Sequence, residues 1–511
     1  MRSRRRTTKW NLFFHYSAFA LAIVSGIVLV PLYLRSISLN LYGAWLATGN
    51  ILAWITIVDP GLSWVLQQRS GVAYGKRDSE QLNALLTGGI MLSAAFSLLL
   101  IIIGLVTSRY LGAWLNLTNI EAIGTIKQAF IIEVVGTSLM FFSFGVTSFN
   151  QGLQSSLGIG IVYITATGAG IALTALLLYE GVGLVALPLG TVVRGLGLTL
   201  GNAAYLFWRY RTEKMRYRFS IRGVSALVKL SSFTFLSRGA SVIATNMDAY
   251  AITRYLGPAV APILILTRKA PDVSRMIIER PSAAVMPAVS HLVGTGELAR
   301  GREVLLQMLQ FILRLLGLFS AGFIVFNDDF VRLWVGKEIF AGYTVNVVIV
   351  LALVVTALTT VLSNLCFSLG NIRGNSIVGF FQGLLSMSLI ILGTKYWGIL
   401  GVAVAPLLAM LCVSAWYYPR TFARLVKLER ADVITLTREA LASVASAMIA
   451  MSAFIWITTK TWPILILAVT AFCTVYLVAL SLMSKTFLSD VSGVLRSNKW
   501  VLKVFPKREH M

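Results

Sequence analysis

The stretch Tyr179-Glu-Gly-Val-Gly-Leu-Val-Ala-Leu-Pro188-Leu189 recurs in altered form about 217 residues later, as Tyr396-Trp-Gly-Ile-Leu-Gly-Val-Ala-Val-Ala-Pro406-Leu407. Each copy stands between two long apolar stretches. A repeat at a fixed spacing indicates that one set of structural elements is used twice along the chain. We therefore look for other positions that keep the same spacing.

Three weaker matches keep nearly this offset. They are Leu34-Arg35 with Thr253-Arg254, Phe149-Asn-Gln-Gly152 with Phe367-Ser-Leu-Gly370, and Asp59-Pro60 with Glu279-Arg280-Pro281. Any single match is explained by a coincidence of small residues. A constant spacing at four places favours an internal repeat.

The composition indicates that the chain folds in a lipid bilayer. Of 511 residues, 57% are hydrophobic and 13% are charged, whereas soluble domains have roughly 45–50% apolar and about 25% charged residues. A bilayer core takes roughly 20 apolar residues per helix, and the chain offers about fourteen such runs. We predict an all-α polytopic membrane protein. The predicted spans are 11–34, 43–66, 82–107, 126–149, 158–178, 182–208, 227–254, 259–289, 304–326, 343–368, 376–394, 398–418, 438–458 and 463–484.

The repeat contains six spans, an even number, so both copies enter the membrane in the same direction. Two such six-helix lobes are related by a pseudo-twofold axis along the membrane normal, and two further helices follow them. The predicted divisions are a basic amino-terminal segment (1–10), an N-lobe (11–208), a basic linker (209–226), a C-lobe (227–418), a basic loop (419–437), helices thirteen and fourteen (438–484) and a basic tail (485–511).

The net charge of +24 reflects Lys and Arg between the apolar spans. A nucleic-acid binder would gather them on one surface, so we expect no nucleic-acid partner. Their excess in alternate loops follows the positive-inside rule and places both termini in the cytoplasm. Cys366, Cys412 and Cys473 all fall inside apolar spans, so we expect no disulfide and no metal site. The chain has three His and no known catalytic motif, so we expect no catalytic residue and no cofactor.

The eighth predicted span carries a cluster of charges. Arg268, Asp272, Arg275 and Glu279 recur at helical spacing on one face. An ionised group at the bilayer centre costs roughly 2.5–3.5 kcal/mol, so this face is expected to meet a wet cavity or a partner. Pro271 and Pro281 are expected to kink this span.

The seventh span repeats the pattern with Arg238, Ser241, Thr245 and Asp248 on one face, and Arg254 near its end. Arginine offers a diphosphate group a forked, always-charged set of donors. The predicted cationic cavity consists of Arg35, Arg238, Arg254, Arg268, Lys269, Arg275 and Arg280. The candidate ion-coupling carboxylates are Asp59, Asp248, Asp272 and Glu279.

Two alternatives remain for the eighth-span cluster. In the first, Arg268 pairs with Asp272 and Arg275 pairs with Glu279, and the pairs serve structure alone. Four cations against two carboxylates still leave a positive surplus. In the second, residues 269–281 form a surface loop.

Several local patterns together resemble one transporter family. They are Leu41-Tyr-Gly43-Ala-Trp45, Val58-Asp59-Pro-Gly61-Leu62, Arg254-Tyr-Leu-Gly257-Pro258, Met286-Pro287-Ala-Val-Ser290, Leu369-Gly370-Asn-Ile-Arg373 and the two Gly-rich stretches. Over about residues 11 to 418 the chain resembles the polysaccharide transporters, the Wzx-type O-antigen oligosaccharide flippases of the multidrug/oligosaccharidyl-lipid/polysaccharide exporter superfamily.

The resemblance implies two lobes around a central cavity that opens alternately to each side of a bacterial inner membrane. The implied cargo is an undecaprenyl-diphosphate-linked oligosaccharide, carried from the cytoplasmic to the periplasmic leaflet for O-antigen, capsule or exopolysaccharide synthesis. The implied partners are this lipid-linked oligosaccharide, membrane lipids, H+ or another coupling ion, and the polysaccharide polymerase machinery.

Three other functions compete with this interpretation. A multidrug cation antiporter of the same superfamily would need acidic groups in its cavity, whereas helices seven and eight have an excess of Arg and Lys. A membrane glycosyltransferase or polymerase would need large outer loops or an acidic cluster, whereas loops 108–125 and 327–342 are short. A lipid-II-type flippase shares the architecture and remains open.

Overall fold

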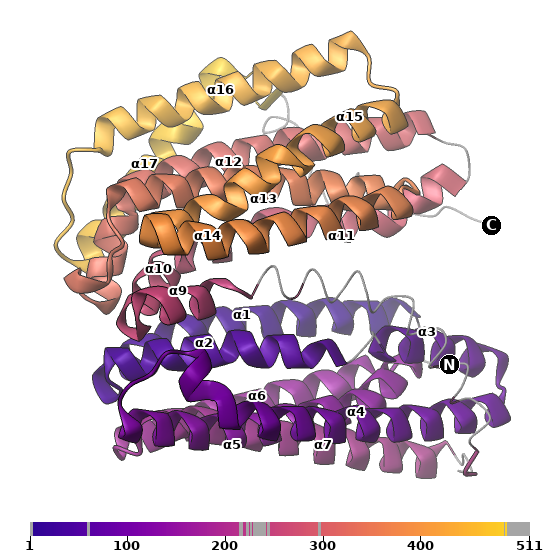
Figure 1. The fold of residues 1–511 in the computed structure, drawn as a ribbon. Helices are drawn as coiled ribbons and strands as arrows, with labels where there is room; N and C mark the ends of the chain where they lie inside the picture. The colour runs from indigo at the N-terminus through magenta and orange to yellow at the C-terminus, as the bar shows by residue number, and fades with distance from the viewer. Residues whose placement is uncertain are drawn as a thin grey trace. The chain divides into compact units, whose positions relative to one another are not determined.

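A computed structural model describes residues 4–58, 62–213, 218–220, 224, 227, 242, 246–294, 298–484 and 486–487. These residues are almost entirely helical, and they include no strand (Figure 1). The chain divides into two compact units, which we call the first unit (Met1–Pro262) and the second unit (Ile263–Met511).

The first unit is built from long helices that begin at polar caps. Ser38, Asp78 and Asn119 each precede a helix and accept a hydrogen bond from a backbone N–H of its first turn, which satisfies a donor that has no partner within the helix. The elements are α1 (Arg4–Ser36), α2 (Leu39–Ile55), η1 (Thr56–Val58), α3 (Leu62–Lys76), α4 (Ser79–Trp114), α5 (Ile120–Gly152), α6 (Ser156–Tyr179), η2 (Gly183–Val185), α7 (Ala186–Thr212), α9 (Asp248–Leu256) and η3 (Pro258–Val260), and α10 (Ala261–Thr267) follows.

Small residues hold the first unit together. A Cβ at Gly195 of α7 would lie 2.8 Å from the Gly136 carbonyl oxygen of α5, and a Cβ at Gly170 of α6 would lie 2.6 Å from the Gly190 carbonyl oxygen of α7. Lipid supplies no hydrophobic force between helices, so close backbone approach at glycine takes its place.

The segment after the predicted linker packs on α2 within the first unit. Trp54 Nε1 donates to the Asn246 carbonyl at 2.7 Å, and the Tyr250 N–H donates to Asn50 Oδ1 at 3.0 Å. The division between units falls after Pro262. The predicted lobe boundary at residues 209–226 stays a prediction, because much of that linker lies outside the described residues.

The second unit surrounds an apolar core. Ile312 of α12, Leu365 of α13 and Phe422 of α15 are almost fully buried there with Ile278 of α11. The elements are α11 (Lys269–Gly294), α12 (Leu298–Val335), η4 (Lys337–Ile339), α13 (Tyr343–Ser368), α14 (Ile372–Cys412), α15 (Ser414–Val426), α16 (Arg430–Phe454) and α17 (Trp462–Met483).

The two C-terminal helices, α16 and α17, pack against α12 through polar contacts as well as apolar ones (Figure 1). Arg314 of α12 forms an ion pair with Glu439 of α16, and the Tyr476 hydroxyl of α17 donates to the Arg314 carbonyl at 2.7 Å. Farther along α12, Asp329 accepts from the Thr459 N–H at 2.7 Å. The helices predicted at 438–484 therefore form part of the second unit.

Within the described residues, ten helices are long and apolar enough to cross a membrane. Three of the predicted spans are missing from this number. The second and eighth are each broken into shorter helices, and most of the seventh lies outside the described residues. The eleventh and twelfth lie in one long apolar stretch, Arg373–Val426, as two arms that meet at the non-helical Gly398, so the predicted division between residues 394 and 398 is confirmed.

The second predicted span, 43–66, is not one helix. The chain instead forms α2, the 3-10 turn η1 and α3, with residues 59–61 outside the described part. Pro60 supplies a reason, because proline has no N–H and disfavours helical backbone in the residue before it.

The eighth predicted span breaks at Arg268, between α10 and α11. Pro271 has no N–H to donate to the Thr267 carbonyl four residues earlier, and Asn327 Nδ2 of α12 donates to that carbonyl instead, at 3.0 Å. Helix α11 continues through Pro281. The predicted interruption is confirmed near Pro271, and the expected second kink does not break the helix at Pro281.

The first glycine of each repeated stretch has a positive φ. Gly181 has φ +79° between α6 and α7, and Gly398, 217 residues later, has φ +60° within α14. The backbone at Gly398 is not helical, so α14 consists of two arms that meet at a kink. Positive φ is readily adopted only by glycine, which explains why both copies keep it here. The rotation that relates the lobes stays a prediction.

Candidate functional site

The predicted charges of the eighth span form a continuous ladder from Arg268, just before α11, to Glu279 within it. Arg268 Nε lies 2.9 Å from Asp272 Oδ2, Arg275 Nη2 lies 3.9 Å from Asp272 Oδ1, and Arg275 Nε lies 3.9 Å from Glu279 Oε1. We call these four residues the charge ladder. Their spacing places all four on one helical face, as the sequence predicted.

The ladder is half-buried and is anchored at one end. Its side chains are between 21% and 37% exposed. Glu279 lies near Thr360 of α13, and Asn364 of α13 donates to Ser282 one turn later, at 3.0 Å. Arg275 Nε and Glu279 Oε1 have no hydrogen-bond partner at their separation. This end of the ladder therefore keeps unused donor and acceptor capacity.

The structure excludes one of the two alternatives for this cluster. Residues 269–281 are helical, so the surface-loop alternative is wrong. Both predicted ion pairs form, so the four ladder charges balance. Lys269 is half-buried and Arg280 is exposed beside the ladder, and together they supply the positive surplus.

The remaining predicted residues are spread over the chain. Arg35 is exposed in the last turn of α1, Arg254 is half-buried in the last turn of α9, and Asp248 is buried at the start of α9. Arg238 and Asp59 lie outside the described residues. Because Arg35, Asp248 and Arg254 belong to the first unit and the ladder to the second, a common cavity stays a prediction.

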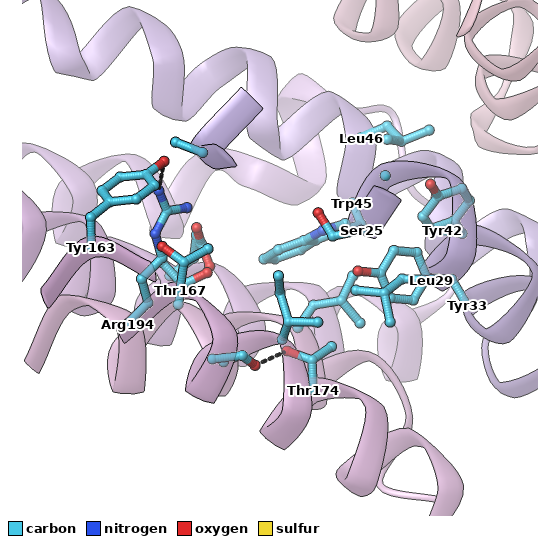
Figure 2. A pocket seen from close by; sticks show the side chains of 18 residues that line it. Ser25, Leu29, Tyr33, Tyr42, Trp45, Leu46, Tyr163, Thr167, Thr174 and Arg194 are labelled. Atoms are coloured by element: carbon cyan, nitrogen blue, oxygen red, sulfur yellow. Dashed lines mark hydrogen bonds between the residues drawn. The ribbon is translucent and has the colours of Figure 1, made fainter. Parts of the chain in front are cut away.

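A polar cavity in the first unit was not predicted from the sequence. It has a volume of about 420 Å³ and lies among α1, α2, α5, α6 and α7. We call it the first-unit cavity. Figure 2 shows Arg194 and Thr167 at one end, Tyr33 and Tyr42 at the other, and Trp45 between them.

The polar groups of this cavity are only partly paired with one another. Arg194 Nη2 donates to the Tyr163 hydroxyl at 3.1 Å, with its guanidinium carbon 5.4 Å from the Tyr163 ring centre. Thr191 lies near the Glu133 carboxyl. Three buried atoms, Glu133 Oε2, Arg194 Nε and Thr167 Oγ1, have no partner. Buried polar atoms without partners are uncommon and call for an explanation.

The sequence did carry a signal for this cavity. Glu133 and Arg194 are isolated charges inside the apolar spans predicted at 126–149 and 182–208, and such charges mark functional sites in membrane proteins. The predicted clusters each lie along one helix, whereas Glu133 and Arg194 come from two helices, α5 and α7. In the described part of the chain, no His, Cys, Asp and Glu side chains group as metal ligands would.

Comparison with known proteins identifies the fold. No protein-family model and no curated protein sequence matches the chain. A structure of the lipid II flippase MurJ in an inward-closed conformation has a TM-score of 0.69 at 14% identity, over 94% of this chain and 99% of that chain. An inward-facing MATE family multidrug transporter of the MOP superfamily has a TM-score of 0.63 at 14% identity, over 81% and 96%. A eukaryotic MATE transporter has a TM-score of 0.57 at 16% identity, over 87% and 99%. The chain therefore has the all-α polytopic membrane fold that these flippase and transporter structures share.

Proposed function

We propose that the chain is a flippase that moves an undecaprenyl-diphosphate-linked oligosaccharide from the cytoplasmic to the periplasmic leaflet of a bacterial inner membrane. The cargo would serve O-antigen, capsule or exopolysaccharide synthesis, in association with the polymerase machinery. Movement would occur by alternating access between two lobes, with both termini in the cytoplasm. The chain would make and break no covalent bonds.

The observation that carries this proposal is the charge ladder with its flanking cations. Six charged residues within the 13 positions from Arg268 to Arg280 include four Lys or Arg and two carboxylates. Such a segment is costly in lipid unless it serves a polar ligand or partner. The fold supports the proposal, since one structure that shares it is a lipid II flippase.

The ladder suits a diphosphate for a chemical reason. Arg268 is held by its 2.9 Å hydrogen bond to Asp272, so its guanidinium group is ordered before a ligand arrives. Arg275 lies 3.9 Å from Asp272 and from Glu279, so its guanidinium group stays close to the ladder while it keeps donors for a ligand. A diphosphate brings several anionic oxygens, which form stronger hydrogen bonds with guanidinium groups than neutral acceptors do. Asp272 and Glu279 limit repulsion among the cations while the site is empty. We propose that these carboxylates, with Asp248 and Asp59, exchange H+ or another coupling ion during the cycle.

A multidrug cation antiporter is the second candidate, because the chain also shares its fold with a MATE transporter. A cationic drug would need a net negative site. The balanced ladder with Lys269 and Arg280 beside it has the opposite sign. A glycosyltransferase is less favoured, because both folds compared above belong to proteins named as flippase or transporters.

The test removes the two ladder arginines. The double variant Arg268→Ala, Arg275→Ala is expected to lose at least about 90% of polysaccharide export in a host that lacks the chromosomal copy, because two charge-assisted contacts to phosphate, each about 1.5–3 kcal/mol, disappear. The double variant with Lys at both positions should retain part of the export, since the charge remains without the fork.

The matched control is Arg332→Ala in α12. Arg332 forms the same kind of i,i+4 pair, with Asp328 at 2.6 Å, and is exposed. It should export at the wild-type rate. Membrane levels are measured for every variant by immunoblotting. Wild-type export by a fully inserted double-Ala variant would refute the anion site, and ethidium efflux by the wild type would favour the antiporter.

A further inference from the structure

We infer that the first-unit cavity binds a neutral sugar ring of the cargo. The inference rests on the proposed function, because it assigns the sugar end of the lipid-linked oligosaccharide to a separate site from its diphosphate. It begins from three buried, unpartnered atoms on residues that line one cavity: Glu133 Oε2, Arg194 Nε and Thr167 Oγ1.

The chemical types of these atoms restrict the ligand. Glu133 Oε2 is an acceptor when ionised, Arg194 Nε–H is a donor, and the Thr167 hydroxyl is both. Glu133 and Arg194 attract one another but form no ion pair, and both are within the described residues. An anion would satisfy Arg194 and be repelled by Glu133, and a cation would do the reverse. A hydroxyl group both donates and accepts, so a neutral ligand with several hydroxyls satisfies all three atoms.

The rest of the lining suits the other surface of a sugar ring. Trp45, Tyr33, Tyr42 and Tyr163 all line the cavity, and Tyr33 and Tyr42 lie with their ring centres 5.9 Å apart. The C–H bonds of a pyranose form apolar faces that pack on aromatic rings, while its hydroxyls project from the edges. Aromatic walls with a few placed polar groups are the usual composition of a small-molecule site.

The volume agrees with a ligand of this size. The cavity of about 420 Å³ is many times the roughly 30 Å³ that one water takes in the liquid. A single water or a bare metal ion would leave most of it unfilled. It lies within the roughly 300–1,000 Å³ range of small-molecule pockets.

The experiment measures protection of a reporter thiol in the cavity. The full chain is purified in detergent with Cys366, Cys412 and Cys473 replaced by Ser, and Leu46→Cys, on the lining, supplies the thiol. Its rate of reaction with a maleimide is measured with glucose, galactose, mannose or N-acetylglucosamine at millimolar concentrations. Choline and inorganic phosphate are the cationic and anionic comparisons. At least one neutral sugar should slow labelling several-fold, and choline and phosphate should not.

Variants connect the protection to the polar groups. Glu133→Leu and Arg194→Leu should each raise the sugar concentration needed for protection by roughly tenfold or more. Glu133→Gln keeps hydrogen-bonding capacity and should raise this concentration less. It replaces Glu133→Leu in the test if the Leu variant does not fold. The controls are Glu121→Gln in α5 and Arg211→Gln in α7, two exposed residues of the same helices that do not line the cavity. They should leave protection unchanged.

The possible outcomes separate this inference from the proposed function. If no sugar protects the thiol, or if choline or phosphate protects it, the inference is overturned while export can still depend on the charge ladder. Protection that survives Glu133→Leu and Arg194→Leu in folded protein also overturns it. Sugar protection in a chain whose export ignores Arg268 and Arg275 would support the sugar site and refute the diphosphate site.

Discussion

Among single residues, Arg314 and Glu439 illustrate how a charge is tolerated inside this fold. Their side chains are 9% and 4% exposed. Thr486 accepts from Arg314 at 3.0 Å, and Ser484 and Thr486 donate to Glu439. Each charge thus has both a counter-ion and further hydrogen bonds, the condition under which a buried pair is stable.

We predict that Glu439→Leu destabilises the chain by about 3–5 kcal/mol, because Arg314 is left as a buried, unpaired charge. The double variant Arg314→Met, Glu439→Leu should be much closer to wild type, since no isolated charge remains. The measurement is thermal unfolding of the full chain in detergent. If the double variant is as unstable as the single one, packing rather than charge explains the loss.

The sequence predicted the charge ladder but not the first-unit cavity. The spacing of Arg268, Asp272, Arg275 and Glu279 was sufficient to predict the ladder, because neighbours on one helix follow from its geometry. Glu133 does not lie near Arg194 in sequence, and their meeting depends on how α5 packs against α7. That packing is set by glycine contacts such as Gly136 with Gly195, which a hydropathy pattern does not reveal.

At the scale of elements, the break between α10 and α11 leaves a backbone carbonyl without its helical donor, and a side chain of another helix supplies one. Asn327 of α12 donates to the Thr267 carbonyl and also to Asn346 Oδ1 of α13, at 2.7 Å, so one amide joins three helices. The break places Arg268 at the start of the charge ladder. Sequence alone located the proline, but it could not identify the residue that replaces the lost donor.

We predict that Asn327→Leu destabilises the chain by about 1–3 kcal/mol, because the buried Thr267 carbonyl loses its donor. Pro271→Ala restores an N–H that can bond to this carbonyl, so the double variant Asn327→Leu, Pro271→Ala should recover part of the loss. Thermal unfolding of the four proteins gives the coupling between the two sites. If the two substitutions change the free energy of unfolding additively, Asn327 does not stabilise the chain by replacing the donor that Pro271 lacks.

The repeated turns make a second prediction at this scale. Gly181→Ala and Gly398→Ala should each cost about 1–2 kcal/mol, because an L-residue is strained at positive φ, although a Cβ would meet no atom at either position. Gly379 in α14 has equally open surroundings and no positive φ, so Gly379→Ala is the matched control and should show no loss. Equal losses at Gly181 and Gly398 would support their equivalence, and no loss at either would remove that support.

For the whole molecule, composition predicted the fold class well, because long apolar helices are the only elements that satisfy their own backbone in lipid here. The number of spans was less accurate. Hydropathy does not detect the break between α10 and α11 near Pro271, whereas it did separate the two arms that meet at Gly398. The predicted twofold relation depends on how the two units sit in the membrane, and hydropathy carries no information on that.

We predict that the electrostatic potential in the transport pathway is positive. If Arg35, Arg254, Lys269 and Arg280 line one central cavity, low-dielectric walls should focus a positive potential there. Cysteine placed singly at each position in a chain without other cysteines should then react faster with anionic than with cationic thiosulfonate reagents of similar size.

The preference should shrink as salt rises, because the Debye length falls from about 10 Å at 0.1 M to about 3 Å at 1 M ionic strength. Glu121, which is exposed in the first turn of α5, is replaced by Cys as the control in an otherwise cysteine-free chain, and this thiol should show little preference. Faster labelling by cationic reagents at the four positions would mean that the pathway attracts cations. A lipid diphosphate would then be repelled from the route it must follow, and the antiporter would become the better account of the same fold.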